Sequence, residues 1–329
     1  MKKHLLPSNK TIYHKQAIEF ATKQLEVFWL PDEIKVEKDV QDILVNMTPA
    51  EKHGVITVLK LFTLYEMFAG DEFWGKRFKQ IFKNDPAMHR MASVFSMFEL
   101  AVHAPFYMKL NEALHLDNEE FYMEYVQDET LKSRMEFIDS LISHKNDLYA
   151  LGTFSLVEGA ILYSSFAFLK HFQSQGKNKL LNVVRGINFS VRDENIHSES
   201  GAWSFRMLKE QRNLSEVEEQ ELKAVIIEAA TTLCEHEFKI VDMIFEKGSI
   251  DGITSKQMQH FVESRINVCL VQLGYDKLYE VPYNPIATTF YQGINNFQFN
   301  DFFSGIGNSY NRAWDESAFE YKTFDKTTK

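Results

Sequence analysis

Four long stretches with helical periodicity dominate this chain and restrict what it can fold into. The first opens with the capping box "TPAE" and covers about residues 48–83, and the second starts near residue 86 and continues through "MASVFSMFELAVHAPFYMKLNEALH". The third, "NDLYALGTFSLVEGAILYSSFAFLKHFQSQG", ends at a Gly176 cap, and the fourth covers about residues 179–211. We expect Pro105 to kink the second stretch. Only 14 Gly and 7 Pro interrupt 329 residues, so the sequence predicts an all-α fold.

Shorter helical segments complete the predicted domain. Capping boxes at residues 215–218 and 254–257 open two further helices, and residues 118–143 hold shorter ones. The last 40 or so residues are rich in Asn, Ser, Gly and Phe and lose this periodicity, which is typical of an extended or mobile tail. We therefore predict one helical domain over residues 1–285 and a partly flexible C-terminal tail over residues 286–329.

Charge and composition argue against several classes of partner. The formal net charge is −10, and no block of Lys or Arg forms a basic patch, so we expect neither a nucleic-acid nor a membrane partner. The chain shows no N-terminal signal pattern and no run of 18 apolar residues, which predicts a soluble cytoplasmic protein. The two cysteines, Cys234 and Cys269, lie inside helical patterns and are interpreted as buried thiols in a reducing compartment.

Acidic residues interrupt the apolar faces of the four long stretches in a repeated order. The order is Glu, then Glu with His, and it occurs twice: Glu66, Glu99 with His103, Glu158, Glu194 with His197. Each half offers one carboxylate from its first helix and a carboxylate plus an imidazole from its second. This is the pattern expected of a dinuclear carboxylate site inside a four-helix bundle.

The charges of these side chains match those of two metal ions. Two divalent cations would be neutralised by four glutamates, and two neutral imidazoles would complete their coordination. Taken singly, Glu66 could be a surface residue and His103 a core histidine, but Glu158 lies in "FSLVEGAILYSSFAF", where an unpaired carboxylate would be costly. The cluster at residues 235–237 has no matching half and is interpreted as structural. Oxygen and nitrogen ligands without thiolates favour iron or manganese over structural zinc.

Four short motifs stand out along the chain: "EVFWLPDEI" near the start, "HAPFY", "VEG" around Glu158 and "RDENIH". They resemble the radical-generating small (beta) subunit of class I ribonucleotide reductase, in which "RDENIH" corresponds to the family's Arg-Asp-Glu-x-x-His and "HAPFY" to its His-x-x-x-Tyr. The resemblance covers nearly the whole chain and implies a ferritin-like four-helix bundle core with additional helices that forms a homodimer. It also implies a dinuclear metal centre of two irons, two manganese ions or one of each, since all three accept these ligands.

The resemblance also implies roles for individual residues. It implies metal ligation by Glu66, Glu99, His103, Glu158, Glu194 and His197. Tyr107 falls at the position of the family's radical tyrosine, Trp29 at that of a tryptophan in its proposed electron path, and Asp193 at that of the carboxylate linking this path to a ligand histidine. Without the resemblance, Tyr107 would be interpreted as a hydrogen-bonded core tyrosine and Trp29 as a core aromatic residue.

One position departs from the family pattern. The family usually places the second-helix glutamate three residues before its histidine, where this chain has Leu100, whereas Glu99 is four residues before His103. Both spacings put the two groups on one helix face, and a π-bulge could absorb the extra residue, so we expect Glu99 to be the ligand. The alternative is an altered metal site in which Leu100 replaces the carboxylate and Tyr107 carries no radical.

The tail has a role in the resemblance as well. Family members dock a flexible C-terminal segment on the large catalytic (alpha) subunit, and a tyrosine in that segment relays the radical. We expect Tyr321 to be this relay, with Phe319 and Phe324 as apolar anchors, and Tyr310 is the alternative.

The functional hypothesis is a radical-generating subunit of ribonucleoside-diphosphate reductase. The metal centre would react with an oxidant, and Tyr107 or the metals would store the oxidising equivalent. This equivalent would pass through Asp193, Trp29 and Tyr321 to the large subunit, which reduces ribonucleotides to the deoxyribonucleotides used in DNA replication. The main alternative is a ferritin-like dimetal oxidase or desaturase acting directly on a small or fatty substrate, and an iron-storage protein is disfavoured because such chains are much shorter.

Overall fold

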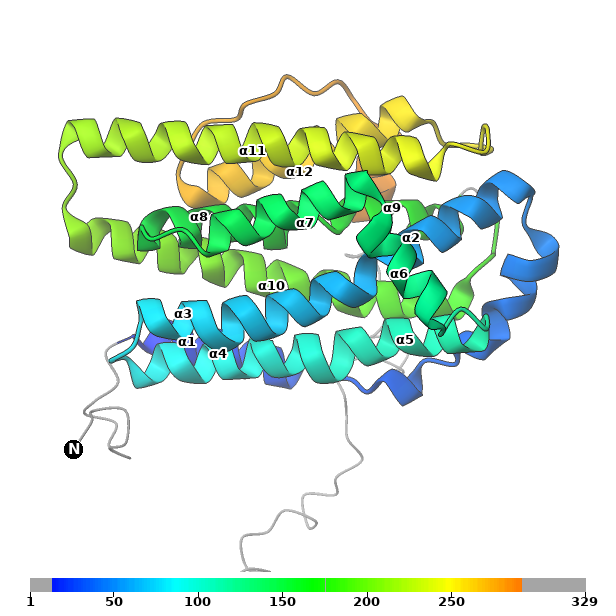
Figure 1. The fold of residues 1–329 in the computed structure, drawn as a ribbon, viewed down its shortest axis with the longest axis horizontal. Helices are drawn as coiled ribbons and strands as arrows, with labels where there is room; N and C mark the ends of the chain where they lie inside the picture. The colour runs from blue at the N-terminus through cyan, green and yellow to red at the C-terminus, as the bar shows by residue number, and fades with distance from the viewer. Residues whose placement is uncertain (1–13, 175, 292–329) are drawn as a thin grey trace, which may run out of the picture.

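The computed structural model describes residues 14–174 and 176–291, and these residues contain helices and turns but no β-strand (Figure 1). The predicted all-α class is therefore confirmed. The α-helices are α1 (Lys15–Glu26), α2 (Pro49–Phe68), α3 (Phe78–Ile81), α4 (Pro86–Phe98), α5 (Ala104–Ala113), α6 (Glu119–Gln127), α7 (Glu129–Ile142), α8 (Asp147–Ala160), α9 (Tyr163–His171), α10 (Leu181–Arg212), α11 (Glu216–Ile244) and α12 (Ser255–Leu273).

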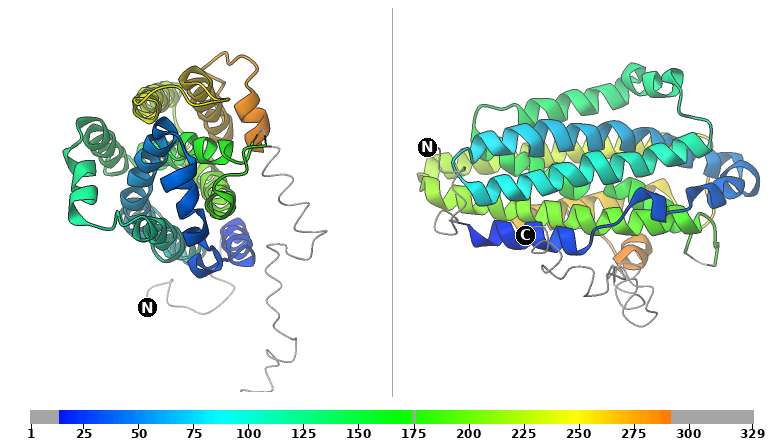
Figure 2. Two further views of the ribbon diagram at one scale, coloured as in Figure 1. Left: turned by 90° about the vertical axis from the view of Figure 1, so that its right-hand side faces the viewer. Right: turned by 90° about the horizontal axis from the view of Figure 1, so that it is seen from below.

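The four long stretches form the central bundle. The first consists of α2, a π-helical segment η6 (Ala69–Arg77) and α3 in direct succession, and the second of α4, a π-helical segment η7 (Glu99–His103) and α5. Helix α8 packs along α10, η6 packs against α4, and α2 packs against α5. Figure 2 shows α1 on the outside of this bundle, where it contacts α4 and α10, while α11 and α12 cover α8.

Local sequence signals set three helix starts as expected, whereas the predicted Gly176 cap was wrong, because α9 ends at His171. Thr48 accepts a hydrogen bond from the backbone N–H of Glu51 at the start of α2, and the Glu51 side chain in turn accepts one from the backbone N–H of Thr48. The same reciprocal capping opens α11 at Ser215 and α12 at Thr254. Such caps satisfy amide groups that a helix start leaves unpaired. We expected a kink at Pro105. The π-helical segment η7 ends two residues before this proline, and α5 follows it without a gap.

The third stretch is broken into α8 and α9, which the sequence did not predict. Arg265 donates to the backbone carbonyl of Gly159 from Nε (3.0 Å) and Nη2 (2.7 Å), and Arg134 donates to the carbonyl of Ile161 (3.2 Å). These buried guanidinium groups take the place of helical N–H donors, so the backbone can leave the helix without losing hydrogen bonds. The stretch from α8 through α9 is apolar and long enough to cross a membrane, but its most apolar window is entirely buried in the protein, so it is a core element.

Residues 285–291 are helical and pack on the domain. Phe290 is buried against Phe261 and Tyr163, and Arg265 donates to the hydroxyl of Tyr291. The remainder of the predicted tail, with Tyr310, Phe319, Tyr321 and Phe324, lies outside the described residues. The division at residue 285 therefore stays a prediction.

Candidate metal centre

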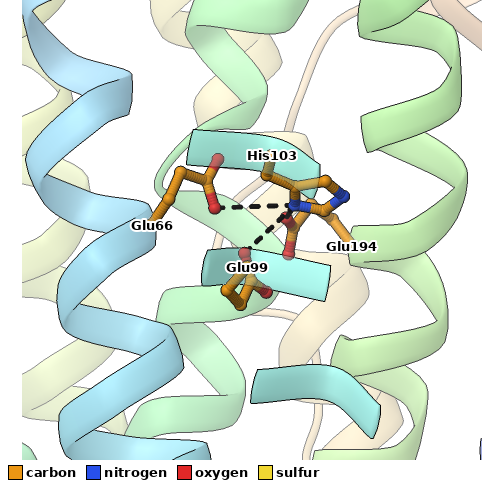
Figure 3. Close-up of side chains that lie close together, drawn as sticks. All are labelled: Glu66, Glu99, His103 and Glu194. Carbon is orange, nitrogen blue, oxygen red and sulfur yellow. Dashed lines mark hydrogen bonds and ion pairs between the residues drawn. The ribbon is translucent and has the colours of Figure 1, made fainter. Parts of the chain in front are cut away.

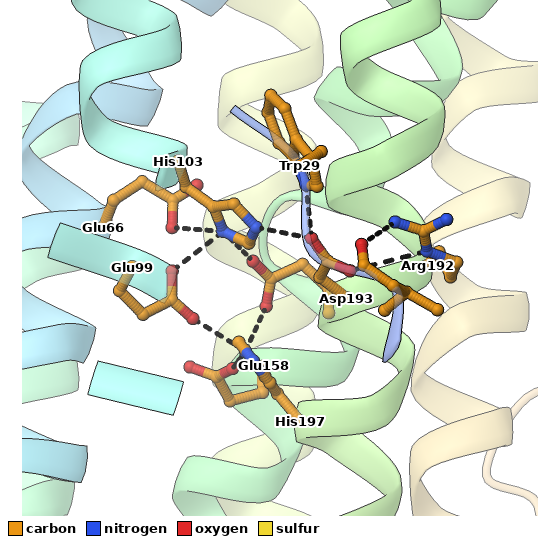
Figure 4. Close-up of polar contacts among 10 residues, drawn as sticks. Trp29, Glu66, Glu99, His103, Glu158, Arg192, Asp193 and His197 are labelled. Atoms are coloured by element: carbon orange, nitrogen blue, oxygen red, sulfur yellow. Dashed lines mark hydrogen bonds and ion pairs between the residues drawn. The ribbon is translucent and has the colours of Figure 1, made fainter. Parts of the chain in front are cut away.

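Six acidic and imidazole side chains converge in the middle of the bundle (Figures 3 and 4). They form two overlapping groups in which the potential ligand atoms lie within 4.8 Å of one another: Glu66, Glu99, His103 and Glu194, then Glu99, Glu158, Glu194 and His197. We call these groups the first and the second cation position. Glu99 and Glu194 belong to both, and all six side chains are at most 2% exposed. The arrangement provides two adjacent positions with two shared carboxylates.

Two π-helical segments shape the part of the site around Glu99. In η7, Glu99 and His103 lie on one face, with His103 Nδ1 3.0 Å from Glu99 Oε2, and Leu100 is in neither cation position. A π-helix has more residues per turn than an α-helix and accommodates the extra residue between the two groups. Gly70 in η6 permits close packing here, because a Cβ atom at Gly70 would lie 2.8 Å from both Glu99 Cβ and Leu100 Cγ.

Both histidines direct Nδ1 at the carboxylates, as Figure 4 shows. His103 Nδ1 lies 3.1 Å from Glu194 Oε1 and 3.6 Å from Glu66 Oε2. His197 Nδ1 lies 2.7 Å from Glu99 Oε1 and 3.4 Å from Glu194 Oε2. Each imidazole thus offers the same nitrogen toward the centre of its own cation position.

Burial governs the protonation of the carboxyl groups. Burial, with the charge of Glu99 adding to it, raises the pKa of Glu66 well above its usual value. Burial and then the charge of Glu194 raise the pKa of Glu158 in the same way. Burial alone would also raise the pKa of Glu99, but its contact with Glu66 and the charges of the two histidines outweigh burial and lower it.

Burial by itself lowers the pKa of the two imidazoles, whereas it raises the pKa of the carboxyl groups. Desolvation disfavours their charged form, but the charge of Glu99 and hydrogen bonds to the surrounding carboxylates outweigh it, so the pKa of both His103 and His197 is raised well above the usual value. Protons on these rings, and on Glu66 and Glu158, therefore balance the buried negative charge when no cation is bound. A metal cation must displace such protons, so its affinity increases with pH.

The six residues fit a pair of divalent cations. Within the described residues, Glu158 Oε1 alone among the eight carboxylate oxygens accepts a hydrogen bond from a side chain outside the six. Buried carboxylates that accept no such hydrogen bonds cost free energy of folding unless they are paired with a charge or bind metal. Four carboxylates, two imidazoles and no thiolate make a donor set that suits iron or manganese.

The predicted partners Trp29 and Asp193 lie directly beside the first cation position. Asp193 Oδ2 accepts a hydrogen bond from Trp29 Nε1 (2.8 Å) and lies 3.1 Å from His103 Nε2 (Figure 4). The indole also stacks on the His103 ring, with 6.1 Å between centroids. Arg192 donates to the carbonyl of Val27 (2.6 Å), which ties the segment before Trp29 to α10. An unbroken set of contacts therefore joins His103, Asp193 and Trp29.

Tyr107 lies on α5, one turn after His103, and is buried. Its ring stacks on Phe62 with 4.2 Å between centroids. Burial, followed by the charge of Glu66, raises the pKa of Tyr107 well above its usual value, so the side chain is a neutral phenol.

Two aromatic neighbours of the site were missed by the sequence analysis. Tyr65 donates a hydrogen bond from its hydroxyl to Glu158 Oε1 (3.2 Å), and Trp74 lies edge-on to His197, with 6.0 Å between ring centroids. Burial and then the charge of Glu158 raise the pKa of Tyr65 well above its usual value. Tyr65 sits in the apolar run "LFTLYEMF" and Trp74 in the mixed segment "AGDEFWGKR", and nothing in either segment distinguishes the aromatic residue from an ordinary core residue.

The cluster at residues 235–237 lies away from the six. Its buried carboxylate, Glu237, pairs with Arg134 at 2.9 Å and accepts a hydrogen bond from Ser164 at 2.8 Å. These contacts satisfy the carboxylate within the packing of α7, α9 and α11, in agreement with a structural role.

Comparison with known proteins gives a consistent result. A family model described as "Ribonucleotide reductase, small chain" matches residues 8–285. The chain is 25% identical over 278 residues to a probable ribonucleoside-diphosphate reductase small subunit of Invertebrate iridescent virus 3, covering 78% of this chain and 72% of the relative. It is 26% identical over 269 residues to the ribonucleoside-diphosphate reductase subunit beta of Treponema pallidum, covering 77% and 72%.

Solved structures share the fold. The dimanganese(II)-NrdF of Streptococcus sanguinis aligns with a TM-score of 0.74 at 22% identity over 86% of this chain and 98% of that chain. A putative class I ribonucleotide reductase from Bacillus halodurans aligns with a TM-score of 0.75 at 22% identity over 85% and 100%. The ferritin-like bundle predicted from the sequence is therefore confirmed.

Proposed function

Because this chain belongs to the ribonucleotide reductase small-chain family, we propose that its six buried carboxylate and imidazole groups hold the metal pair with which a class I enzyme generates its radical. The chain is the small, radical-generating subunit of a ribonucleoside-diphosphate reductase, and its partner is the large catalytic subunit. In this proposal the ligands are Glu66, Glu99, His103, Glu158, Glu194 and His197.

The observation that carries the proposal is the sharing of Glu99 and Glu194 between the two cation positions. A carboxylate has two oxygens, so Glu99 and Glu194 would be able to serve both cation positions. Two shared carboxylates would favour a coupled metal pair over two independent ions. The relative from Streptococcus sanguinis is named as a dimanganese(II) protein, and this donor set accepts manganese, iron or one of each.

When bound, the metal pair supplies oxidising power for one-electron chemistry. The residues of the protein determine which groups near the metal pair can be oxidised. Asp193 fixes the orientation of His103 through Nε2, and the apolar side chains Phe62, Phe95 and Phe98 help to exclude water from the surroundings. Tyr107 is a neutral phenol, so its oxidation requires the loss of both an electron and a proton. We propose that Tyr107 stores the oxidising equivalent, with storage on the metals as the alternative.

The contacts of Trp29 support an exit route from the buried site. Trp29 is 1% exposed and hydrogen-bonds Asp193, while the next residue along the chain, Leu30, is 43% exposed. The buried indole therefore links Asp193 to a segment of the chain whose next residue is exposed. We propose that the equivalent leaves through Asp193 and Trp29 and reaches the large subunit through Tyr321 in the tail. A self-contained oxidase or desaturase would have no use for such a route.

Assembly and location form part of the same proposal. Exposed apolar side chains lie on α2 and on two helices that it contacts, and they suit a homodimer interface: Met67, Met108, Met123 and Val126. We propose that the predicted tail docks on the large subunit through its part beyond residue 291, since residues 285–291 pack on the domain. The two free, buried cysteines fit a reducing compartment, and we place the protein in the cytoplasm.

The proposal is tested by loading the purified full-length chain with iron or manganese and an oxidant. We expect two metal ions per chain and a tyrosyl radical signal in electron paramagnetic resonance, together with reductase activity when the large subunit is added. Tyr107→Phe should keep both metals and lose the radical signal. Tyr149→Phe, a tyrosine change on α8 outside the ligand set, is the control and should keep the signal.

Two outcomes would contradict parts of the proposal. Full reductase activity in Tyr107→Phe would eliminate the tyrosyl radical and leave storage on the metals. Glu194→Ala removes a shared carboxylate and should weaken both cation positions. If this variant still binds two metals as tightly as the unmodified chain, the six residues are not the ligand set.

A further inference from the structure

The two cation positions differ in how their unshared ligands are held. Glu66 and His103 belong only to the first position, and Glu158 and His197 only to the second. A ligand needs a partner outside the metal site to fix its orientation, and such partners contribute strongly to metal affinity. The contacts of these four side chains can therefore be compared one by one.

At the first position the histidine is anchored and the carboxylate is not. His103 Nε2 lies 3.1 Å from Asp193 Oδ2, on the ring edge opposite the cation position. Within residues 14–174 and 176–291, neither oxygen of Glu66 accepts a hydrogen bond from a side chain outside the six.

At the second position the assignment is reversed. His197 Nε2 has no hydrogen-bond partner in the described part of the chain, and the ring packs against Phe95 with 4.4 Å between centroids. Glu158 is the anchored ligand, because its Oε1 accepts a hydrogen bond from the hydroxyl of Tyr65 (3.2 Å). The other oxygen, Oε2, lies 3.4 Å from His197 Nδ1, inside the cation position.

Tyr65 is well placed for this contact. It precedes Glu66 on α2, so two consecutive side chains of one helix reach the two cation positions. Tyr65 is 1% exposed, and a phenol fixed in a packed core cannot swing away from its acceptor. A phenol has a single hydrogen, which it donates to the carboxylate, and the opposite oxygen is thereby left free to face a cation.

We propose that Tyr65 is a positioning residue for the second cation position, where it orients Glu158 as Asp193 orients His103 at the first. This inference rests on the proposed function, since it assumes that the six residues bind metal. It assigns a role to a side chain that is not one of the six. Loss of the Tyr65 hydroxyl would leave the second position with no anchored unshared ligand, while the first would keep its own.

The test is metal binding by full-length Tyr65→Phe, which removes one oxygen atom and keeps the ring. Metal-free protein is titrated with Mn²⁺, and free and bound metal are followed by electron paramagnetic resonance. We expect one manganese ion per chain to bind as in the unmodified protein and the second to bind about 10-fold to 100-fold more weakly. At metal ratios that give the unmodified chain a spin-coupled pair, the variant should show the spectrum of isolated Mn²⁺.

Tyr163→Phe is the matched control. Tyr163 is equally buried, and its hydroxyl has no hydrogen-bond partner among the described residues. This variant also removes one buried oxygen and should bind both manganese ions like the unmodified chain. Equal binding of both ions by Tyr65→Phe, or equal weakening of both, would overturn the inference.

A second comparison separates positioning from a general packing effect. If Tyr65 acts through Glu158, adding Tyr65→Phe to Glu158→Gln should weaken Mn²⁺ binding no further. A further loss of affinity in the double variant would contradict the inference. The comparison of the double variant with Glu158→Gln can also be made if Tyr65→Phe alone folds poorly. In the Glu158→Gln background, the carboxylate charge that accepts the hydrogen bond of the phenol is absent. If the unmodified chain binds a pair of neither manganese nor iron ions, the proposed function itself fails, and the inference fails with it.

Discussion

Asp193 connects the metal ligands to the N-terminal part of the chain through a single carboxylate. Its Oδ2 atom is shared between His103 and Trp29, and the side chain is completely buried. One group thus orients a ligand and also holds the proposed start of the exit route. A substitution of His103 should therefore affect metal binding, whereas a substitution of Trp29 should affect radical transfer.

Trp29→Phe is expected to separate these two functions. The change removes the indole and its hydrogen bond to Asp193 but leaves the contact between Asp193 and His103. We expect both metals to bind with nearly unchanged affinity and reductase activity with the large subunit to fall to background, as measured by metal analysis and a deoxyribonucleotide assay. Trp203→Phe, a tryptophan that packs on Phe20 of α1, should keep activity. An active Trp29→Phe variant would rule out the proposed route.

The sequence was informative for residues whose type is unusual in its surroundings. Carboxylates and histidines that interrupt the apolar faces of the long helical stretches identified the six side chains that the structure brings together, although their ligand roles stay a prediction. Tyr65 could not be found in this way, because a tyrosine in an apolar helix is ordinary. Its partner, Glu158, is 93 residues away in the chain, and only the packed bundle brings the two together.

At the level of elements, the π-helical segments η6 and η7 adapt two regular helices to the site. They face each other at Gly70, where the absence of a Cβ atom allows the backbone of η7 to approach. This approach sets the position of Glu99, which is shared by both cation positions. The local geometry of one glycine is therefore tied to the spacing of the metal ligands.

Gly70→Ala should disturb the metal site through this contact. The new methyl group would displace η7, at a cost of about 1–3 kcal/mol in the free energy of unfolding, and would move Glu99. We expect metal binding to weaken at both positions while the helical circular dichroism is retained.

Gly152→Ala is the matched control, because its Cβ atom would meet Ile226 Cδ1 at 2.6 Å and Phe205 Cε2 at 2.8 Å, away from the ligands. This variant should lose comparable stability in thermal unfolding and still bind two metals. If Gly70→Ala binds both metals as tightly as the control does, Gly70 does not set the position of Glu99.

Helix starts with capping boxes were predicted well, but the predicted end of the third stretch at Gly176 was wrong, since α9 ends at His171, and interruptions with distant causes were not predicted. The capping boxes at residues 48–51, 215–218 and 254–257 each open a helix in the structure. The break between α8 and α9 has no glycine or proline at residues 161 and 162. It depends on Arg134 and Arg265, which reach the freed carbonyls from other helices, and a local sequence pattern carries no trace of such contacts.

At the level of the whole molecule, the folded domain and the predicted tail should be separable. A chain that ends at residue 291 retains every described contact of the metal site. We expect it to fold and bind two metals like the full-length chain but to lose its complex with the large subunit, as measured by sedimentation of the mixture. A peptide of residues 310–329 should compete with the full-length chain for the same partner.

Tyr321→Phe in the full-length chain provides the control for this experiment. Its binding to the large subunit should persist, since Phe319 and Phe324 remain, while reductase activity is lost. Undiminished binding of the chain that ends at residue 291 would show that the tail is not the docking segment.

The depth of the six side chains also has a kinetic meaning. They come from four separate parts of the bundle, and none is more than 2% exposed, so the exchange of a bound ion requires local opening of the helix packing. The residence time of an ion is then governed by how often the bundle opens, rather than by the strength of any one bond to a ligand. An incorrect ion, once enclosed, would be replaced only slowly. The metal content of the pair would then depend on which ions are available in solution when the helices pack together.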